Sequence, residues 1–295
     1  MKDFVIFTDS CIDLPHQQTL DMQIEVIPLC INLEGQVYYN YLDERDITFK
    51  TFYQALREKK QPITSQINPQ GFIDAMEPFL IEEKDILSIS FSSALSGTYQ
   101  SSLIARDELL EKYPERKIIM IDSLCASMGQ GLLVKYASDL RQEGKSIDEV
   151  ASWVEKNKTK IVHLFTVGDL NHLRRGGRLS YGKAFLGSIL RIKPLLHVTS
   201  DGKLVQTGMA RGRMTSLKKM VERMTETIEN PQVIYISHGD CLEDALELKD
   251  MILEKLNVDD IVINFVGPVI GSHSGLDTLA LFYIGNDRYQ EYEGH

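Results

Sequence analysis

Three segments in the first half of the chain share one pattern: a short β-branched apolar run ends at a small polar cluster, and a stretch with helical periodicity follows. The apolar runs cover residues 4–7, 86–91 and 118–121, and the clusters after them are Thr8-Asp9-Ser10, Ser92 to Thr98 and Asp122-Ser123. Repeated strand, turn and helix units are typical of a parallel sheet. Because ligands bind outside the carboxyl ends of parallel strands, the pattern places a site at these polar clusters.

The pattern changes in the second half. Asp201-Gly202 separates two apolar runs, and an Asp-Gly turn in that setting predicts a β-hairpin. We therefore expect an α/β protein of two domains, 1–160 with a mostly parallel sheet and flanking helices, and 161–295 with a mixed α+β sheet. The helices are expected at 127–142, 147–158, 212–228 and 242–256, and the strands at 161–167, 195–199, 204–207, 233–237, 261–266 and 279–284.

Residues 22–60 are less regular. An apolar run covers 24–33, a turn follows at Gly35, and residues 49–59 have helical periodicity. Pro62 stops that helix, because proline cannot continue the hydrogen-bond ladder. The polar trio Thr64-Ser65-Gln66 is expected to begin a new loop.

Charge and composition narrow the possible partners. The 295 residues carry 32 Lys and Arg against 42 Asp and Glu, a formal net charge of −10, so we expect no nucleic-acid partner. No uncharged apolar run approaches the roughly 18 residues that a membrane-spanning helix needs, and the run 4–7 is too short for a signal peptide. Four dispersed cysteines suit a reducing compartment. We expect a soluble, cytoplasmic protein without stable membrane insertion.

Several hydroxyl and carboxyl side chains follow predicted strands. Ser96-Gly97-Thr98 stands where backbone N–H groups and the helix dipole favour an anion, although either hydroxyl is also suited to capping the helix. Thr64 and Ser65 leave the same two alternatives open. Asp9, at the end of the first strand, is equally suited to be a functional acid or a helix cap.

One histidine, His273, lies in a segment with three glycines and two serines, Gly267 to Gly275. A histidine on such a loop is suited to donate to a carboxylate, to act as a base, or only to structure the loop. Arg211 and Arg213 begin the predicted helix after the hairpin and are suited either to an anion or to solvent. A second basic cluster, Arg174, Arg175 and Arg178, is read equally well as surface charge or as a partner contact.

Cofactor motifs are incomplete. Gly129-Gln130-Gly131 follows a strand, but Val134 occupies the position where a dinucleotide fingerprint requires glycine or alanine. Gly144-Lys145-Ser146 is not a phosphate loop, because Asp139 stands where that motif has its first glycine, and the histidines lack the spacings of a zinc site. We expect neither a cofactor nor a metal.

Taken in order, Thr8-Asp9-Ser10, Thr64-Ser65-Gln66, the run Leu95 to Ser101, Asp122-Ser123, Arg174 to Arg178 and Gly267 to Gly275 closely resemble the DegV family over nearly the whole chain. The resemblance implies a two-domain α/β protein that binds a long-chain fatty acid, such as palmitate, stearate or oleate, between its domains. It also implies a protein without catalytic activity, which presents the carboxylate to a separate ATP-dependent fatty-acid kinase protein for acyl-phosphate formation in phospholipid metabolism.

The resemblance also implies roles for single residues. Thr64 and Ser96 match the threonine and serine that bind the carboxylate, and His273 matches a histidine near that group. Their neighbours Ser65 and Gly97 are included in the expected carboxylate site. Arg211 is included as well, although Gly212 stands between Arg211 and Arg213, where such families carry threonine between the two arginines.

Two rival functions remain open at this point. One is a hydrolase or phosphotransferase that uses His273 with Ser96 or Asp9. The other is a regulatory module that binds a different amphiphile, such as a lipid phosphate.

Overall fold

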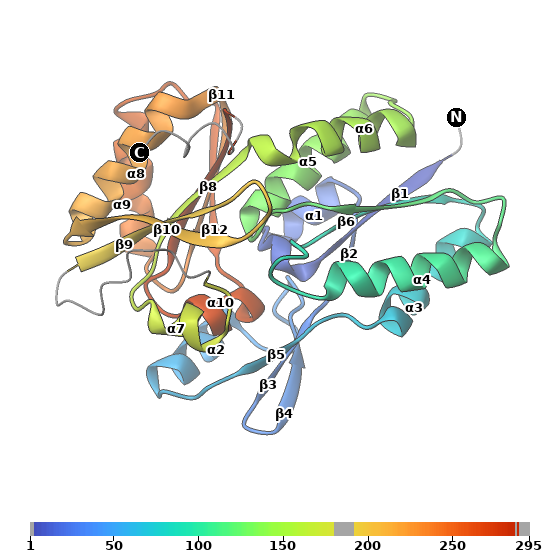
Figure 1. The fold of residues 1–295 in the computed structure, drawn as a ribbon, viewed down its shortest axis with the longest axis horizontal. Helices are drawn as coiled ribbons and strands as arrows, with labels where there is room; N and C mark the ends of the chain where they lie inside the picture. Colours follow the sequence, from blue (N-terminus) through green and yellow to red (C-terminus); the bar gives the residue numbers. More distant parts are fainter. Residues whose placement is uncertain (1–2, 180–191, 287, 289–295) are drawn as a thin grey trace.

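A computed structural model describes residues 3–179, 192–286 and 288. Its first sheet has the strand order β2-β1-β6-β7, and every neighbouring pair is parallel (Figure 1). The predicted parallel sheet is therefore confirmed. Its strands are β1 (Phe4–Asp9), β2 (Glu25–Ile27), β6 (Asp85–Ser90) and β7 (Ile118–Asp122).

Helices cover both faces of this sheet (Figure 1). All residues of β1 and β6 are buried, which explains why these strands read as continuous apolar runs instead of alternating patterns. One face carries α5 (Met128–Gln142) and α6 (Ile147–Asn157), and the other carries α3 (Pro69–Ile81) and α4 (Thr98–Lys112). The short α1 (His16–Asp21) follows β1 and the 3-10 turn Ser10–Ile12.

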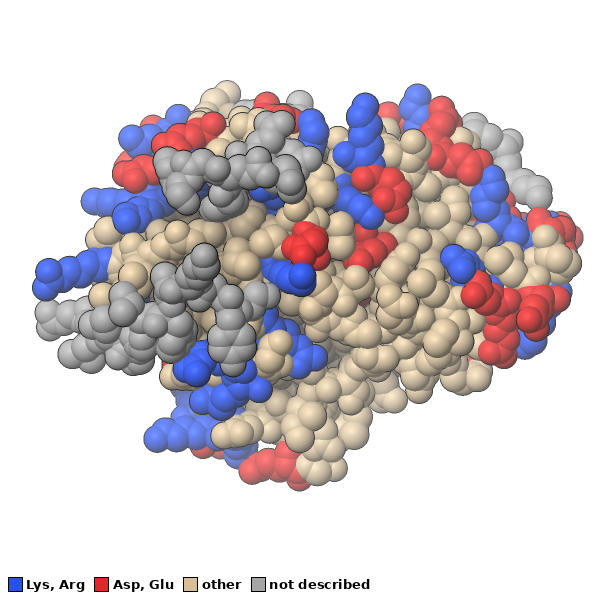
Figure 2. Space-filling model, viewed as in Figure 1, with Lys and Arg blue, Asp and Glu red and all other residues tan. Residues whose placement is uncertain are grey.

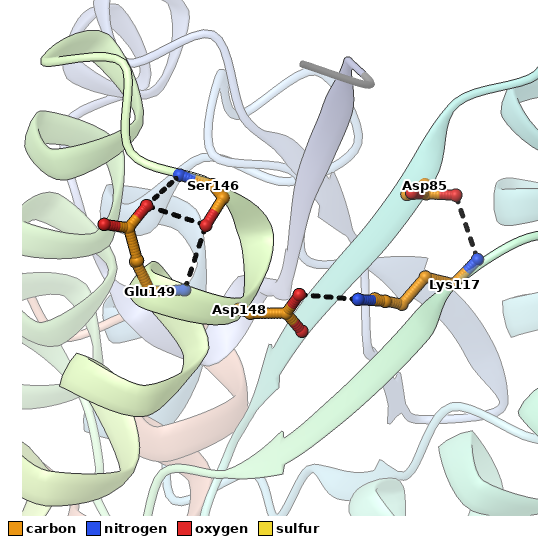
Figure 3. A network of polar contacts seen from close by, with 5 residues as sticks. All are labelled: Asp85, Lys117, Ser146, Asp148 and Glu149. Carbon is orange, nitrogen blue, oxygen red and sulfur yellow. Dashed lines mark hydrogen bonds and ion pairs between the residues drawn. The ribbon is translucent and has the colours of Figure 1, made fainter.

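Polar contacts fix the start of α6 against the sheet (Figure 3). Ser146 and Glu149 form a capping box, in which Glu149 Oε2 accepts from the Ser146 amide at 2.8 Å. Lys117, just before β7, reaches Asp148 through Nζ at 2.6 Å, and its backbone N–H donates to Asp85 Oδ1 at 2.9 Å. These contacts orient α6, while its buried face supplies most of the stabilisation.

The second sheet has the order β10-β9-β8-β13-β11-β12 and is mixed, because only β11 and β12 are parallel. The hairpin predicted around Asp201-Gly202 is confirmed as β9 and β10. The strands are β8 (Ile161–Thr166), β9 (Ile192–Val198), β10 (Leu204–Arg211), β11 (Ile228–His238), β12 (Asp260–Phe265) and β13 (Leu279–Gly285), and the helices between them include α8 (Arg213–Thr227) and α9 (Leu242–Leu253).

A third, three-stranded sheet has the order β4-β3-β5 and lies below the other two in Figure 1. The apolar run 24–33 supplies both β2 and β3, which belong to different sheets. Thr64 and Ser65 were expected in a loop but lie in β5, because Thr64 pairs with Ile31 in an antiparallel ladder. The elements are β3 (Cys30–Leu33), β4 (Gln36–Tyr39), β5 (Ile63–Ser65) and the nearby helix α2 (Phe49–Arg57).

The glycine-rich segment around His273 is also more regular than expected. Residues Pro268–Ser274 form the helix α10, with Pro268 in its first turn and Gly275 at its end with φ of 79°. Proline is pre-organised for a first helical turn, and the positive φ favours glycine. Another short helix, α7 (Asn171–Arg175), packs against α10.

The predicted division at residue 160 falls just before β8, where the chain passes from the first sheet to the second. One buried apolar cluster nevertheless includes Phe7 of the first sheet with Phe165 and Phe282 of the second. The division into 1–160 and 161–295 stays a proposal.

Candidate functional site

A cavity of about 410 Å³, here called the central cavity, lies between the carboxyl ends of the parallel strands and the inner face of the second sheet. Its volume is within the range of small-molecule sites. The apolar side chains that line it come from both halves of the chain: Leu29, Phe91, Leu95, Ala126, Phe165, Leu173, Val198, Leu204, Val266, Val269, Ile270, Ala280 and Phe282.

Strand alternation in β13 separates this lining from a second core. Ala280 and Phe282 face the central cavity, whereas Leu279, Leu281 and Tyr283 belong to the buried cluster that α8 and α9 cover. Successive side chains of a strand point to opposite faces, so one apolar strand supplies both surfaces. The wall of the cavity is therefore a regular sheet face rather than an irregular gap.

Polar groups from three separate elements gather at one part of the cavity. Thr64 comes from β5, Ser96 and Gly97 precede α4, and His273 comes from the last turn of α10. Thr64 Oγ1 lies 2.8 Å from His273 Nε2. Ser65 also lines the cavity, so five of the six predicted site residues lie around it.

Ser96 makes hydrogen bonds at the start of α4 and also lines the cavity. Its Oγ accepts from the backbone N–H of Thr98 at 3.2 Å and lies 2.9 Å from Thr98 Oγ1. This contact supports the first turn of α4, as a cap does, while the side chain still lines the cavity.

His273 is held neutral in this setting. Burial lowers its pKa to about 4, and the positive charge of Arg178 contributes in the same direction. The close approach of Gly176 to His273 Nδ1 requires a glycine, because a Cβ there would lie 2.3 Å from that nitrogen. At neutral pH the ring therefore offers one N–H donor and one acceptor instead of a charge.

Among the residues that the structure describes, the arginine that lines the cavity is Arg178, not Arg211. Arg178 donates to the carbonyl oxygens of Leu95 and Gly176, which places its guanidinium beside Ser96. Arg211 ends β10 with an exposed side chain and does not line the cavity. Arg213 is engaged by Asp244 at 2.9 Å. The cavity is lined by Val198 and Leu204, at the other end of the β9–β10 hairpin, so the expected role of Arg211 in the carboxylate site gains no support from this geometry.

Asp9 has a structural position. Its carboxylate accepts from the backbone N–H groups of Phe91 at 2.7 Å and Cys11 at 3.1 Å, and from Gln130 Nε2 at 3.2 Å. Burial raises its pKa to about 6. These bonds join β1 to the end of β6 and to α5, and Asp9 is not among the residues that line the cavity. The capping alternative is the one that this geometry supports.

A second buried acid, Asp13, connects the two halves of the chain. Its Oδ2 accepts from Ser127 Oγ at 2.6 Å, and its Oδ1 accepts from the Gly267 amide at 3.0 Å. Burial raises its pKa to about 7. Ser127 and Ser237 both line the cavity and lie 3.0 Å apart through their hydroxyls. These contacts between distant segments had no signal in the sequence.

Neither a membrane-spanning helix nor a metal-binding cluster is found among the residues that the structure describes. No helix within 3–179, 192–286 and 288 is long and apolar enough to cross a membrane. In the same part of the chain, no group of three or more His, Cys, Asp or Glu side chains is arranged to hold a metal ion.

Together, the parallel sheet, the mixed sheet and the largely apolar cavity between them define an α/β fold with a site for a small, mostly apolar molecule. The profile described as "Uncharacterised protein, DegV family" matches residues 3–286. A DegV domain-containing protein of Clostridium perfringens is 49% identical over 290 residues, which cover 98% of this chain and 99% of that relative. The chain belongs to the DegV family.

Solved structures agree with this assignment. One is a DegV family protein from Thermus thermophilus whose structure shows fatty acid binding. It superimposes with a TM-score of 0.86 at 31% identity, and the match covers 96% of this chain and 99% of that one. A fatty acid binding DegV family protein from Streptococcus agalactiae gives a TM-score of 0.84 at 28% identity, with coverage of 96% and 98%.

Proposed function

We propose that this protein binds a long-chain fatty acid, such as palmitate, stearate or oleate, in the central cavity, with the carboxylate at Thr64, Ser65, Ser96, Gly97 and His273. The observation that carries the proposal is the distribution of polarity: hydroxyl and imidazole donors gather at one part of a cavity whose other walls are mostly apolar. The fatty acid binding of the Thermus and Streptococcus relatives supports it.

The two parts of the ligand contribute differently. At about 0.8 kcal/mol per buried CH₂, a tail of roughly 15 methylenes contributes on the order of 12 kcal/mol before ordering costs are subtracted. Hydrogen bonds to the carboxylate contribute much less net free energy. The apolar wall therefore supplies affinity, and the polar group fixes the position of the head.

We further propose that the protein has no catalytic activity of its own and presents the carboxylate to a separate ATP-dependent fatty-acid kinase protein. A basic hollow adjoins the head-group site and shares Thr64, Arg178 and His273 with it. Its other polar side chains are those of Lys60, Gln61, His172, Arg175 and Ser272. Lys and Arg side chains gather over α7 and the neighbouring part of α2 in Figure 2, although the whole chain has a net charge of −10. Such a hollow suits an incoming phosphoryl group.

Neutral donors at the head group suit that transfer. The Ser96 and Thr64 hydroxyls and the neutral His273 ring hold a carboxylate by hydrogen bonds, while the nearby Arg178 is already engaged by the carbonyl oxygens of Leu95 and Gly176. The carboxylate oxygen then keeps the electron density with which it attacks a phosphoryl group. By contrast, a hydrolase with Asp9 as its acid gains no support, because Asp9 is engaged by Phe91, Cys11 and Gln130.

The test measures phosphorylation of bound palmitate by a purified fatty-acid kinase protein. We expect Thr64→Ala and Ser96→Ala each to slow the reaction at least tenfold, with a smaller loss of palmitate affinity. Ser93→Ala is the matched control, because Ser93 belongs to the same polar cluster but is exposed and does not line the cavity. Rates equal to wild type in both variants would contradict the assigned head-group roles.

A further inference from the structure

Helix α10 presents a stripe of four residues to the central cavity: Val269, Ile270, His273 and Ser274. Their spacing of three and four residues puts them on one face of a helix. Val269 and Ile270 lie one turn before the other two. The same helix face is therefore apolar in its first turn and polar in its last.

Two serines of α10 differ in how their hydroxyls are engaged. Ser272 Oγ donates to the Pro268 carbonyl at 2.6 Å, the usual way in which a helical serine satisfies itself. Ser274 is only 4% exposed, yet its Oγ has no hydrogen-bond partner among the described residues. Within that part of the chain, it is the one buried, unpartnered side-chain polar atom that belongs to a residue lining the central cavity.

An unpartnered hydroxyl in an apolar wall is unfavourable, because it has lost its hydrogen bonds to water. Alanine would fit a position facing an alkyl chain without this cost. The other hydroxyls that line the cavity near α10 are engaged: Thr278 Oγ1 donates to the Gly275 carbonyl at 2.9 Å, and Ser237 Oγ lies 3.0 Å from Ser127 Oγ. Ser274 thus has an available donor at the cavity, and a bound ligand can supply its acceptor.

The position of Ser274 along the helix identifies that acceptor. Consecutive residues rise by about 1.5 Å along a helix, so Ser274 lies at nearly the same level as His273, whose Nε2 is 2.8 Å from Thr64 Oγ1. The apolar turn with Ile270 begins beyond that level. In a fatty acid, the hydrogen-bond acceptors at the level of the polar turn are the carboxylate oxygens.

We propose that Ser274 Oγ donates a hydrogen bond to the ligand's carboxylate from its buried position next to His273; this assignment rests on the proposed fatty-acid function. Ser274 then selects for an ionised head group. A ligand with the same chain and a neutral head, such as hexadecanol, gains less from the same donor, because hydrogen bonds to charged groups are stronger.

The test compares palmitate with hexadecanol in wild-type protein, Ser274→Ala and Ser274→Thr, with dissociation constants measured by calorimetry. In Ser274→Ala we expect palmitate binding to weaken roughly tenfold and hexadecanol binding by less than about threefold. Ser274→Thr, which keeps the hydroxyl, should retain most of the preference for palmitate. Ser272→Ala is the matched control, because its hydroxyl is already used within α10, and it should leave both constants unchanged.

Thermal unfolding without ligand gives an independent readout. Removing an unpartnered buried hydroxyl should leave the Tm of Ser274→Ala equal to or above that of wild type, so that weaker binding cannot come from a damaged fold. An unchanged palmitate constant, or equal losses for palmitate and hexadecanol, would overturn the assignment of Ser274. Failure of the wild-type protein to bind palmitate would instead contradict the proposed function itself.

Discussion

The two sheets contribute different kinds of surface to one cavity. The parallel sheet reaches it through the ends of its strands, where loops carry hydroxyls such as Ser96 and backbone N–H groups at the start of α4. The mixed sheet reaches it through a strand face, where Ala280 and Phe282 alternate with residues of a separate core. The strand ends supply hydrogen-bonding groups for the head of the proposed ligand, and the strand face supplies apolar area for its tail. Different substitutions should therefore change head-group selection and tail affinity separately.

The largest expected effect comes from filling the sheet face. Ala280 lines the cavity, and a phenylalanine in its place occupies space that the proposed tail needs. We expect Ala280→Phe to weaken palmitate binding at least a hundredfold, since displacement of a few methylenes already costs several times 0.8 kcal/mol. Titration calorimetry measures the loss. Palmitate affinity within threefold of wild type would show that the tail does not run along this face.

Leu281, the next residue of β13, provides the opposite case. It is fully buried in the core beneath α8 and α9 and faces away from the cavity. We expect Leu281→Ala to lower the free energy of unfolding by about 2–5 kcal/mol through the cavity it leaves, while palmitate affinity changes by less than about threefold. Urea unfolding and calorimetry on the same sample separate the two effects. A variant that loses palmitate binding without losing stability would contradict the assignment of Leu281 to the core on the far side of β13.

The contribution of Asp13, which links the two halves of the chain, to the free energy of unfolding is expected to depend on pH. Burial raises the pKa of Asp13 from 3.8 to about 7, so between these values the folded protein binds more protons than the unfolded chain, and stability falls as pH rises. Asp13→Asn cannot ionise and removes this decline. We therefore expect the stability of Asp13→Asn relative to wild type to increase between pH 4.5 and 7.5 by roughly 2–4 kcal/mol.

Urea unfolding of both proteins at a series of pH values measures that difference. His273, whose pKa is lowered to about 4, contributes the opposite slope, but it is present in both proteins and cancels in the comparison. Parallel stability curves would show that Asp13 is not a buried, proton-binding group.

A smaller effect is expected at Gly271 in α10. A Cβ at this position would lie 2.7 Å from the fully buried ring of Phe52 and 3.0 Å from the Tyr53 hydroxyl oxygen. Neither ring has free space, so we expect Gly271→Ala to cost about 1–3 kcal/mol of stability and to displace His273 slightly. Thermal unfolding, together with palmitate affinity, provides the check. A rise in Tm would mean that α10 can move away from α2 without loss.

Local patterns predicted much of the fold. Apolar runs and turn residues located β1, β6 and β7 and the hairpin around Asp201-Gly202. Buried strands and tight turns depend mainly on the residues within each short segment, so a local pattern identifies them. They did not reveal β5, whose three residues are a strand only because β3 pairs with them. The helix α10 was also missed, since glycine-rich segments lack helical propensity and tertiary packing decides their conformation.

The residues of the candidate site were likewise predicted from the sequence only in part. Thr64, Ser96 and His273 were identified from motifs, and the structure brings them to one cavity. Arg178 lines this cavity and Arg211 does not, because the path of the chain after α7, rather than any local spacing, decides which basic cluster approaches Ser96. The free hydroxyl of Ser274 became visible only through what it does not contact, and a sequence does not contain that information.

The most direct test of the central claim is native mass spectrometry of freshly purified protein, followed by extraction and identification of the bound molecule. We expect one long-chain fatty acid per chain, lost from Ala280→Phe and retained in Leu281→Ala. A protein that stays empty after incubation with palmitate and oleate, or that carries a different amphiphile such as a lipid phosphate, would contradict it.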